Sequence, residues 1–426
     1  MAKVVLATVG SLGDLHPFIA IGRALAARGE QVLLAVPEDG LAKARAAGLD
    51  AAAILPSYET ICARLGMTQG EAAAEIISDV NFVLDEVLLP TLAASTRALD
   101  DLSSGADVIV GSIFALAADI VAEKRGLPFA SVLLQPMTMF SAWQPPAAPR
   151  FEMMRQNPRT IAGRSWNRAL IAVGRAALRR RLAGQINAVR AEHGLTRMKN
   201  VPLVDHGPIT RAVVCCWPKA MGVLPPDAPR SASLVGFPLF DSESGAEEAV
   251  LPELLDFLSA GDAPIVFTLG SVAVASPGRF YEEAAAASRM LGKRSLMLTG
   301  GSEPPRIEGG CMFLGYAPHS IVFPHAAAVV HHGGIGTTGQ TLRAGNVQIV
   351  VPHYGDQFDN AARLRRAGVG LTIRRARFER RHAANVISRA LSDPSMASAA
   401  HRIALEIRED DGAAAAAHVI AGLHHG

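Results

Sequence analysis

Residues 326–338, AAAVVHHGGIGTT, contain the pattern that decides the fold: an apolar run, two histidines, a glycine-rich turn and the start of a helix. The apolar run is typical of a strand buried on both faces. Backbone N–H groups at a helix start carry partial positive charge and bind phosphate, and the glycines within 333–336 would let a diphosphate approach the main chain. The stretch therefore predicts an anion site, to which His332 and Thr337 can add side-chain hydrogen bonds.

The two histidines of this stretch do not predict a metal site. His331 and His332 are adjacent in a strand, so their side chains point to opposite faces and cannot easily hold one ion. A histidine at a strand end is more often structural than functional. The neighbouring glycine-rich turn is the feature that favours an anion site.

A second polar loop follows the next strand of the same half. The apolar run 348–351 leads into His353-Tyr354-Gly355-Asp356-Gln357. Ligands of open parallel sheets lie at the carboxyl ends of the strands, so Asp356 and Gln357 are expected beside the phosphate turn, where they could hold sugar hydroxyls. The alternative is a turn aspartate that caps the helix beginning near Asn360.

The pattern of strand, glycine loop and helix occurs in both halves of the chain. Residues 3–9 (KVVLATV) precede the loop Gly10-Ser11-Leu12-Gly13-Asp14, and a helix is predicted from Pro17 to Arg28. Residues 265–269 (IVFTL) precede Gly270-Ser271 in the same way. We therefore expect an α/β fold with two parallel-sheet domains, residues 1–235 and 251–426, and a linker at 236–250, with the last helices packing back on the first domain.

The composition limits the classes of protein. Half of the 426 residues are hydrophobic, 5% are aromatic and the net charge is +2, which gives no reason to expect nucleic acid as a partner. The four cysteines show no C-x-x-C spacing and are expected to be reduced. No signal-peptide pattern opens the chain, and five prolines interrupt the uncharged stretch 127–149, so we expect a cytoplasmic protein without a membrane span.

One segment is strongly basic. Residues 150–199 contain eleven arginines and one lysine against two glutamates, a formal net charge of +10. The simpler interpretation is a solvated helix face. The alternative is a surface that contacts anionic lipid, which would place the protein peripherally at the inner face of the cell membrane.

Several of these stretches resemble one known family. GYAPHSIVFPHAAAVVHHGGIGTTGQTL (315–342) and VPHYGDQFDNA (351–361) resemble the donor-binding signature of family 1 glycosyltransferases, which have the GT-B architecture of two facing Rossmann-like domains. The first glycine loop, with Asp14 and Pro17, is similar to that of sterol glucosyltransferases and rhamnolipid enzymes. The stretches GSIFALAADIVAEKRGLP, INAVR, GFPLFD and VFTLGS look most like the B subunit of bacterial rhamnosyltransferases.

The resemblance implies roles for individual residues. Tyr316 stands where the family places the ring that stacks on the donor base, and Gln340 stands where a glutamate usually binds the ribose of UDP, so dTDP-sugars are possible donors as well. The positions expected to contact the diphosphate are Gly13, Ser271, His332, Gly334, Gly336 and Thr337. The sugar is expected at Asp356 and Gln357.

The catalytic base is expected in the first loop. Family members of the plant type have a histidine at position 14 that is oriented by an aspartate near position 112, whereas this chain has Asp14 and Ser112. A carboxylate needs no orienting partner to be ionised at neutral pH. Asp14 is therefore the expected base. His16 is the rival, and a loop aspartate that only accepts backbone hydrogen bonds is the structural alternative.

The implied reaction is inverting and needs neither a metal nor a resident cofactor. No D-x-D occurs in the chain, so the carboxylate pair that holds Mg²⁺ or Mn²⁺ in other glycosyltransferases is missing. Backbone N–H groups and His332 would stabilise the leaving diphosphate. We expect a hexose, by rhamnosyl or glucosyl transfer, to pass from a UDP- or dTDP-sugar to a hydroxyl of an apolar or lipid acceptor, with residues 133–146 lining the acceptor pocket.

Other functions remain as alternatives. A natural-product glycosyltransferase of the macrolide, sterol or carotenoid type would share these motifs, and so would a non-catalytic activator of another glycosyltransferase. A nucleotide-sugar epimerase shares the architecture and would act on the donor alone. A dehydrogenase is disfavoured because the first loop, with Gly10 and Gly13, lacks the G-x-G-x-x-G spacing.

Overall fold

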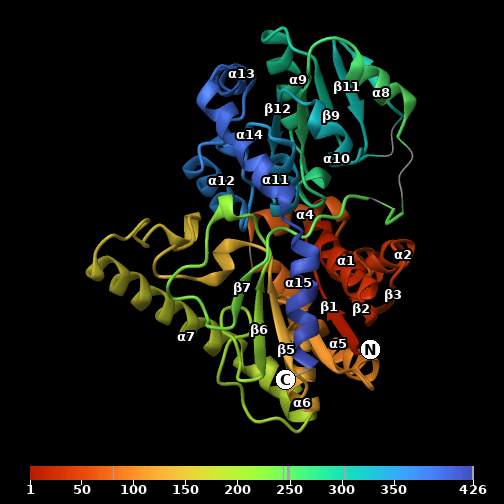
Figure 1. Ribbon diagram of the computed structural model, residues 1–426, viewed down its shortest axis with the longest axis vertical. Coiled ribbons are helices and arrows are strands. Elements are labelled where there is room, and N and C mark those ends of the chain that lie inside the picture. Colours follow the sequence, from red (N-terminus) through yellow and green to blue (C-terminus); the bar gives the residue numbers. More distant parts are fainter. Residues whose placement is uncertain (80, 243, 247–249, 302–303, 425–426) are drawn as a thin grey trace. The chain divides into compact units, whose positions relative to one another are not determined.

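The computed structural model describes all residues except 80, 243, 247–249, 302–303 and 425–426 (Figure 1). The chain forms two compact units. The N-terminal unit comprises Met1–Gly66, Asn81–Phe240 and Asp411–Gly426, and the C-terminal unit comprises Met67–Val80 and Asp241–Asp410. The unit boundary at Phe240 falls within the segment that the sequence identifies as a linker.

The sheet of the N-terminal unit is parallel throughout its described ladders, in the order β3-β2-β1-β4-β5-β6-β7. Its strands are β1 (Lys3–Ala7), β2 (Gln31–Pro37), β3 (Asp50–Leu55), β4 (Val108–Ser112), β5 (Phe129–Leu133), β6 (Thr210–Cys215) and β7 (Ala232–Leu234). Val4, Val5 and Leu6 are completely buried, as a strand covered on both faces requires. The strand order reverses between β1 and β4, so the loops after these two strands flank a topological switch point, where such sheets bind ligands.

Helices cover the sheet of the N-terminal unit. They are α1 (Leu12–Ala27), α2 (Glu38–Ala46), α3 (Tyr58–Leu65), α5 (Leu89–Leu102), α6 (Leu116–Arg125), α7 (Ile161–Glu192) and α15 (Gly412–Ala421), with a π-helical turn η1 (Val83–Leu88) directly before α5. The last helix, α15, packs against α1. A side chain at Gly412 would collide with the backbone of Gly236 and Phe237, so this contact requires glycine.

The start of α1 corrects the sequence prediction. The helix begins at Leu12 rather than Pro17, because Ser11 and Asp14 form a capping box that satisfies its first N–H groups. Pro17 lies inside the helix, where it lacks the N–H that would bond to the carbonyl of Gly13. Asp14 is therefore a helix residue and not a loop residue.

The C-terminal unit has a similar sheet, in the order β10-β11-β9-β8-β12-β13-β14, which reverses between β8 and β12. Its strands are β8 (Ile265–Thr268), β9 (Ser295–Leu298), β10 (Arg306–Glu308), β11 (Cys311–Leu314), β12 (Ala328–His331), β13 (Gln348–Val350) and β14 (Gly370–Thr372). The described pairs are parallel except β10 with β11, which form an antiparallel hairpin that the sequence did not predict. The expected α/β class with two largely parallel sheets is confirmed.

The helices of the C-terminal unit include one from the first part of the sequence. They are α4 (Gln69–Ser78), α8 (Pro252–Ser259), α9 (Phe280–Met290), α10 (His319–Val322), α11 (Ile335–Ala344), α12 (Gln357–Arg366), α13 (Arg380–Leu391) and α14 (Pro394–Glu409). Helix α4 packs near the loop after β8, where Gly70 approaches the carbonyl of Ala275. The prediction of one uninterrupted N-terminal domain did not include this excursion of the chain.

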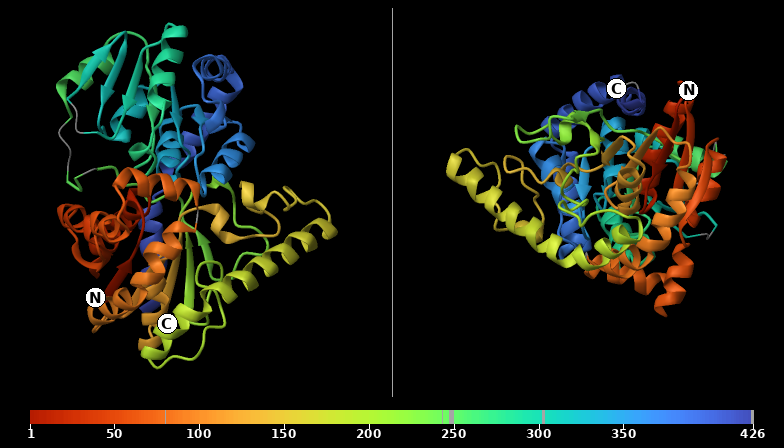
Figure 2. Two further views of the ribbon diagram at one scale, coloured as in Figure 1. Left: turned by 180° about the vertical axis from the view of Figure 1, so that it is seen from behind. Right: turned by 90° about the horizontal axis from the view of Figure 1, so that it is seen from below.

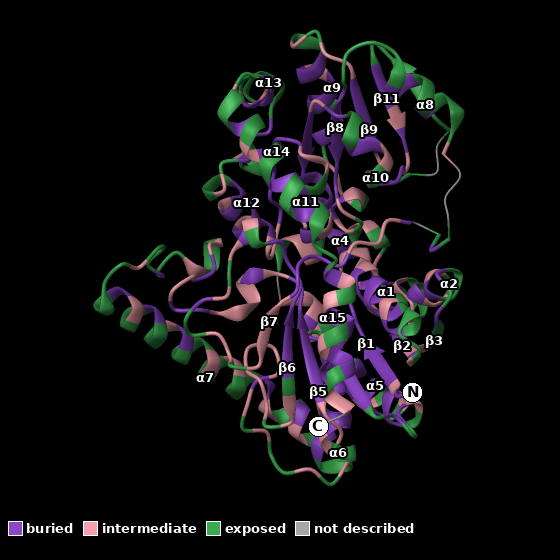
Figure 3. Ribbon diagram, viewed as in Figure 1, coloured by how far each residue is buried: buried purple, intermediate pink, exposed green. Residues whose placement is uncertain are grey.

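The strands carry the core of each unit, and much of α7 is exposed to solvent (Figure 3). Helix α7 has 32 residues, and its N-terminal half extends away from the sheet of its own unit (Figures 1 and 2). Within the described chain, no helix has both the length and the apolar character needed to cross a bilayer.

Candidate active site

The glycine-rich turn between β12 and α11 is fixed by His331. The N–H of Gly333 donates to His331 Nδ1 at 3.1 Å, and His331 Nε2 lies 2.8 Å from the Oε1 of Gln348. Since Nδ1 accepts, Nε2 carries the proton and donates to Gln348. Burial lowers the pKa of His331 to about 4. His331 is thus a neutral structural residue that supports Gly333, whose φ of 94° favours glycine.

His332 lies on the other side of the strand and has different surroundings. Side chains at Gly270 and Gly334 would come within 2.4 and 2.3 Å of its Nε2, so only glycine fits on either side of the ring. Its Nδ1 is buried and has no hydrogen-bond partner within the described structure. Burial is the main cause that holds the pKa of His332 well below its usual range. The neighbouring His331, His353 and His319 lower it further. A neutral imidazole can offer a hydrogen bond to an anion but no charge.

The first turn of α11 is open to a ligand. Gly334 is its N-cap and makes no side-chain capping bond, so the N–H groups of the first turn lack the cap that Ser11 supplies to α1. Apart from its chain neighbours and the backbone of its own helix, no described atom lies within 4 Å of where a side chain of Gly336 would begin. Thr337 and Gln340 are 8% and 7% exposed on the same helix.

The loop after β13 reaches the glycine turn through a residue that the sequence reasoning missed. Asn360 Nδ2 donates to the carbonyl of Gly333 at 2.9 Å and to Asp356 Oδ2 at 2.7 Å. Asp356 is the N-cap of α12 but makes no capping bond with its side chain. An asparagine one helical turn after Asp356 is the signal that could have revealed this connection.

Gln357 has a role in shaping its own loop. Its Oε1 accepts the N–H groups of His353 at 2.8 Å and Tyr354 at 3.2 Å. The expectation that Gln357 binds sugar hydroxyls is therefore restricted to its amide nitrogen. Two backbone donors that share one oxygen fix the orientation of this amide.

The remaining expected donor-binding residues belong to neighbouring loops of the C-terminal unit. Ser271 is exposed directly after β8, which pairs with β12, so it lies at the same switch point as His332. The Tyr316 hydroxyl contacts Asp241 Oδ1 at 3.5 Å, and Asp241 Oδ2 accepts the N–H of Ser320 at 2.5 Å.

The expected base lies in the N-terminal unit at the start of α1. Asp14 Oδ2 accepts the N–H of Ser11 at 2.9 Å and its hydroxyl at 3.4 Å. Burial raises the pKa of Asp14 to about 6, against the two hydrogen bonds from Ser11 that lower it. A carboxyl group with this pKa is a better proton acceptor near neutral pH than a solvated one.

The surroundings of Asp14 qualify two other predicted roles. The N–H of Gly13 donates to Ser11 Oγ at 3.3 Å, so this amide is already used by the helix cap and is not free for a diphosphate. The His16 ring packs edge-on against Phe240 with centroids 5.4 Å apart. Ser112 Oγ accepts the N–H of Val9 at 3.5 Å and so fixes the strand that leads into the loop.

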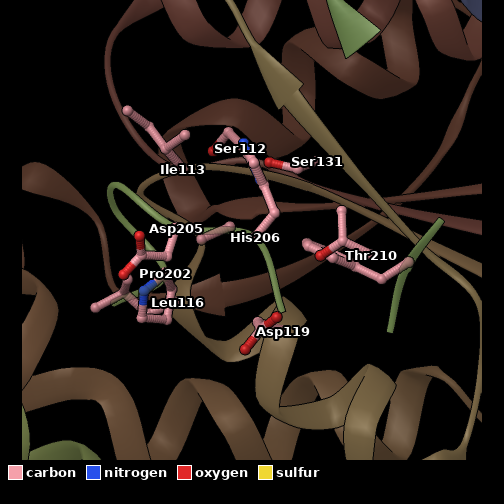
Figure 4. A pocket seen from close by; sticks show the side chains of 11 residues that line it. Ser112, Ile113, Leu116, Asp119, Ser131, Pro202, Asp205, His206 and Thr210 are labelled. Carbon is pink, nitrogen blue, oxygen red and sulfur yellow. The ribbon is translucent and has the colours of Figure 1, made fainter. Parts of the chain in front are cut away.

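Two cavities flank the turn after β4. One is lined by Val9, Ile54, Leu55, Leu88, Thr91, Leu92, Ser95 and 114–117. The hydroxyls of Thr91 and Ser95 bond to carbonyls of their own helix, so this cavity is apolar. The other has the polar side chains of Asp119, Asp205 and His206 in its wall (Figure 4).

The segment expected to line the acceptor pocket, 133–146, packs partly against α7. Ala142 is buried in a small cluster with Met154 and Ile171, and the guanidinium of Arg168 lies 4.6 Å from the ring of Trp143. Asp227 accepts hydrogen bonds from Ser141 and from the N–H of Ala142. These contacts connect the part of 133–146 that follows β5 to α7, and the lining of neither cavity includes it.

Metal ligands do not gather in the described part of the chain: no three His, Cys, Asp or Glu side chains are placed to hold one ion. The G-x-G-x-x-G spacing, which the first loop lacks, does occur at Gly334, Gly336 and Gly339. The spacing alone therefore does not separate dehydrogenases from this protein. The comparison with known proteins does.

Two largely parallel sheets, one with an uncapped helix N-terminus at its switch point, define an α/β protein of two units. Residues 302–420 match the family described as erythromycin biosynthesis protein CIII-like, C-terminal domain. The chain is 31% identical to O-mycaminosyltylonolide 6-deoxyallosyltransferase of Streptomyces fradiae, over 96% of this chain and 94% of that protein. It is 25% identical to a sterol 3-beta-glucosyltransferase of Debaryomyces hansenii, over 96% of this chain and 26% of that protein.

The solved structures agree on the fold. The crystal structure of the glycosyltransferase VinC in complex with dTDP superposes with a TM-score of 0.69 at 18% identity, over 99% of both chains. The chain belongs to the family 1 glycosyltransferases with the GT-B fold. The resemblance inferred from the sequence motifs is thereby confirmed at the level of the family.

The buried histidines predict a loss of stability in mild acid. His331 has an ordinary pKa near 6.5 when unfolded and about 4 when folded, so the unfolded state binds more protons between these values and stability falls as the pH decreases from 6.5 to 4. At pH 5 this one residue should cost about 2 kcal/mol. His331→Asn should reduce the pH dependence by about that amount in urea unfolding followed by far-UV circular dichroism.

The control for this prediction is His325→Asn, which removes an exposed histidine of the same unit. Tryptophan fluorescence would not report unfolding of the C-terminal unit, because all three tryptophans (Trp143, Trp166 and Trp217) lie in the N-terminal unit. Circular dichroism is therefore the signal to use. An equal pH dependence in both variants would contradict the assignment.

Proposed function

We propose that the protein is an inverting, metal-independent hexosyltransferase that uses a UDP- or dTDP-sugar and glycosylates a hydroxyl of an apolar acceptor. The observation that carries the proposal is the uncapped N-terminus of α11 together with the imidazole of His332, whose Nε2 lies beside the N-cap residue Gly334. Both offer hydrogen bonds to one anion from fixed positions. Preorganised donors of this kind stabilise the charge that develops on a leaving diphosphate.

The donor side works through dipoles. His332 is neutral, so it contributes a hydrogen bond alongside the N–H groups of the α11 first turn. Asn360 holds Gly333 and Asp356 together, and Asp356 is then positioned to accept hydroxyls of the sugar. Departure of the diphosphate on one side and attack on the other is a single displacement, which inverts the anomeric carbon.

The acceptor side is supported by a group of apolar residues around the turn after β4 in the N-terminal unit. These residues include Leu88, Leu92 and 114–117, and Val9 beside them lies shortly before α1, the helix that carries Asp14. Burying apolar surface away from water lowers the free energy. Apolar residues here therefore favour a lipid, a sterol or a macrolide-like alcohol over a sugar or a peptide. The names of the relatives, a tylonolide and a sterol glycosyltransferase, point to such acceptors.

Asp14 is our proposed general base. An alcohol becomes a competent nucleophile when its proton is removed as the bond forms, and the Oδ1 of Asp14 remains for this after Oδ2 has accepted from Ser11. The capping box holds the side chain in one orientation, which serves catalysis and the helix alike.

We also propose that the protein works in the cytoplasm and contacts anionic membrane through α7. Ile161, Trp166 and Val173 are 74%, 45% and 67% exposed along this helix. Arg179 and Arg180 are exposed beside them, and Glu192 is the sole acidic residue of α7. A helix with apolar and basic exposed side chains is suited to a lipid surface.

The direct test is an assay of the purified protein with UDP- and dTDP-sugars and a series of apolar alcohols in excess EDTA. Turnover should persist in EDTA, and the product should have the anomeric configuration opposite to that of the donor. Activity that is lost in EDTA and restored by Mg²⁺ would contradict metal independence. Isomerisation of the donor without an acceptor would indicate an epimerase.

Asp14→Asn should lower turnover by a factor of roughly 10² to 10⁴, the usual contribution of a general base, with little change in donor affinity. In the wild type, kcat/KM should fall as the pH decreases through about 6, because Asp14 becomes protonated. Ser11→Ala removes one hydrogen bond that lowers this pKa, so it should shift the acidic limb to higher pH and leave the plateau rate nearly unchanged. A larger loss in His16→Asn than in Asp14→Asn would reverse the two roles.

Gln340→Glu should raise the affinity for UDP relative to dTDP by on the order of tenfold, since a carboxylate accepts from both ribose hydroxyls and deoxyribose offers only one. Titration calorimetry with each nucleotide measures the ratio. Thr337→Val is the comparison. It removes a proposed contact with the diphosphate, which both nucleotides share, so it should lower the affinity for UDP and dTDP equally. An unchanged ratio in Gln340→Glu would remove this residue from donor selection.

The double variant Arg179→Gln/Arg180→Gln should weaken flotation with phosphatidylglycerol vesicles at low salt, and Val173→Asp should add to the loss. The matched control is Arg343→Gln/Arg408→Gln, which removes the same charge from exposed sites of the C-terminal unit. Equal flotation of the two double variants, or no flotation of the wild type, would exclude α7 as a membrane contact.

A further inference from the structure

An arginine-rich turn follows the edge strand β14. Thr372 pairs with Val350 of β13, and the N–H of Ile373 donates to the carbonyl of Val350 at 2.9 Å. The chain then continues through Arg374 into the 3₁₀ turn Arg375–Arg377. Because β13 and β14 are parallel, this turn leaves the sheet at the same edge as the loop that begins at His353.

The backbone of this turn is fixed by residues other than its arginines. Ile373 is buried on one side, and on the other Phe378 stacks on Phe280 with ring centroids 4.6 Å apart. The N–H and the guanidinium of Arg380 bond to Glu283 at 2.8 and 3.1 Å. The turn is therefore held at both ends.

Three arginines on the turn do not stabilise the fold through side-chain hydrogen bonds or ion pairs with described residues. Arg374, Arg375 and Arg377 are exposed, and their side chains form no hydrogen bond or ion pair with any residue that the structure describes. The helix dipole accounts for arginines at the end of α12 but not for these three, which lie in a 3₁₀ turn.

The positive charge is concentrated around this turn. Residues 365–381 contain seven arginines and one acidic residue, Glu379, in a chain whose net charge is +2. Helix α12, which ends in Arg365 and Arg366, packs beside β14. Like charges at this density repel each other, and a bound anion would relieve the repulsion.

The turn is within electrostatic reach of the donor loop. Burial lowers the pKa of His353 to about 4, and the charge of Arg375 contributes to the shift. His353 precedes Asp356 in the loop that is tied to the glycine turn by Asn360. In the described structure, these arginines form no hydrogen bond with this loop.

We propose that Arg374, Arg375 and Arg377 form a second anion site, separate from the donor diphosphate site, that binds phosphate groups. Guanidinium groups bind phosphate with two parallel hydrogen bonds, and a turn that is already fixed loses little entropy on binding. The phosphate belongs either to a small soluble molecule or to a lipid headgroup. The site goes beyond the proposed transfer reaction and does not depend on it.

The test measures binding of pyrophosphate by calorimetry while UDP or dTDP saturates the donor site. The turn variant Arg374→Gln/Arg375→Gln/Arg377→Gln should bind pyrophosphate at least tenfold more weakly than the wild type. The control Arg289→Gln/Arg389→Gln/Arg408→Gln removes the same charge from exposed helix positions of the same unit and should remain within about twofold of the wild type. Equal affinities of the two triple variants, or no binding by the wild type, would overturn the proposal.

A vesicle experiment distinguishes the two sources of phosphate. If the turn variant loses flotation with phosphatidic acid vesicles and the control retains it, the site binds lipid headgroups. If both variants float equally and only pyrophosphate binding differs, the site binds soluble phosphate. Failure of UDP and dTDP to bind would count against the proposed transferase and would leave the comparison of the two variants intact.

Discussion

The two hydrogen bonds of His331 are the constraint on which the donor side of the protein depends. Its Nδ1 accepts from Gly333 and its Nε2 donates to Gln348, so one buried ring joins β12, β13 and the glycine turn. Gly333 in turn offers its carbonyl to Asn360, which holds Asp356. A single neutral imidazole thus sets the start of α11 and the position of the next loop. Its neighbour His332 is the residue that we propose for the diphosphate.

The two units use the same strand-turn-helix arrangement for opposite purposes. In the N-terminal unit the helix is closed by Ser11 and Asp14, and the N–H of Gly13 is consumed by that cap. In the C-terminal unit the N-cap is Gly334, which has no side chain with which to close the helix. The open N–H groups predict where an anion binds, and the closed cap shows where a carboxylate is held. The weak sequence similarity of the two halves therefore conceals a difference in function.

Sequence reasoning succeeded where a local pattern determines a local structure. The buried strands and the glycine turn follow from apolar runs and glycine spacing, and the family follows from the resemblance of residues 315–342 and 351–361 to a known signature. The capping box was missed, although Ser11 and Asp14 have its spacing, because Pro17 was taken as the start of the helix. The polar connection through Asn360, the use of Gln357 by its own loop and the packing of Trp143 beneath Arg168 depend on contacts between distant segments, which no single-sequence period encodes.

The neutrality of the donor site has a physical consequence. Burial keeps His331, His332 and His353 uncharged, so none of them supplies a formal positive charge next to a diphosphate. Fixed dipoles in a dry site can stabilise a leaving anion without reorganisation, and they hold the product less strongly than a buried cation would. Formal charge is placed instead on exposed arginines, where water lowers the cost of desolvation. In the function that we propose, this division separates the stabilisation of the transition state from the attraction of anions to the surface, so that each could vary without the other.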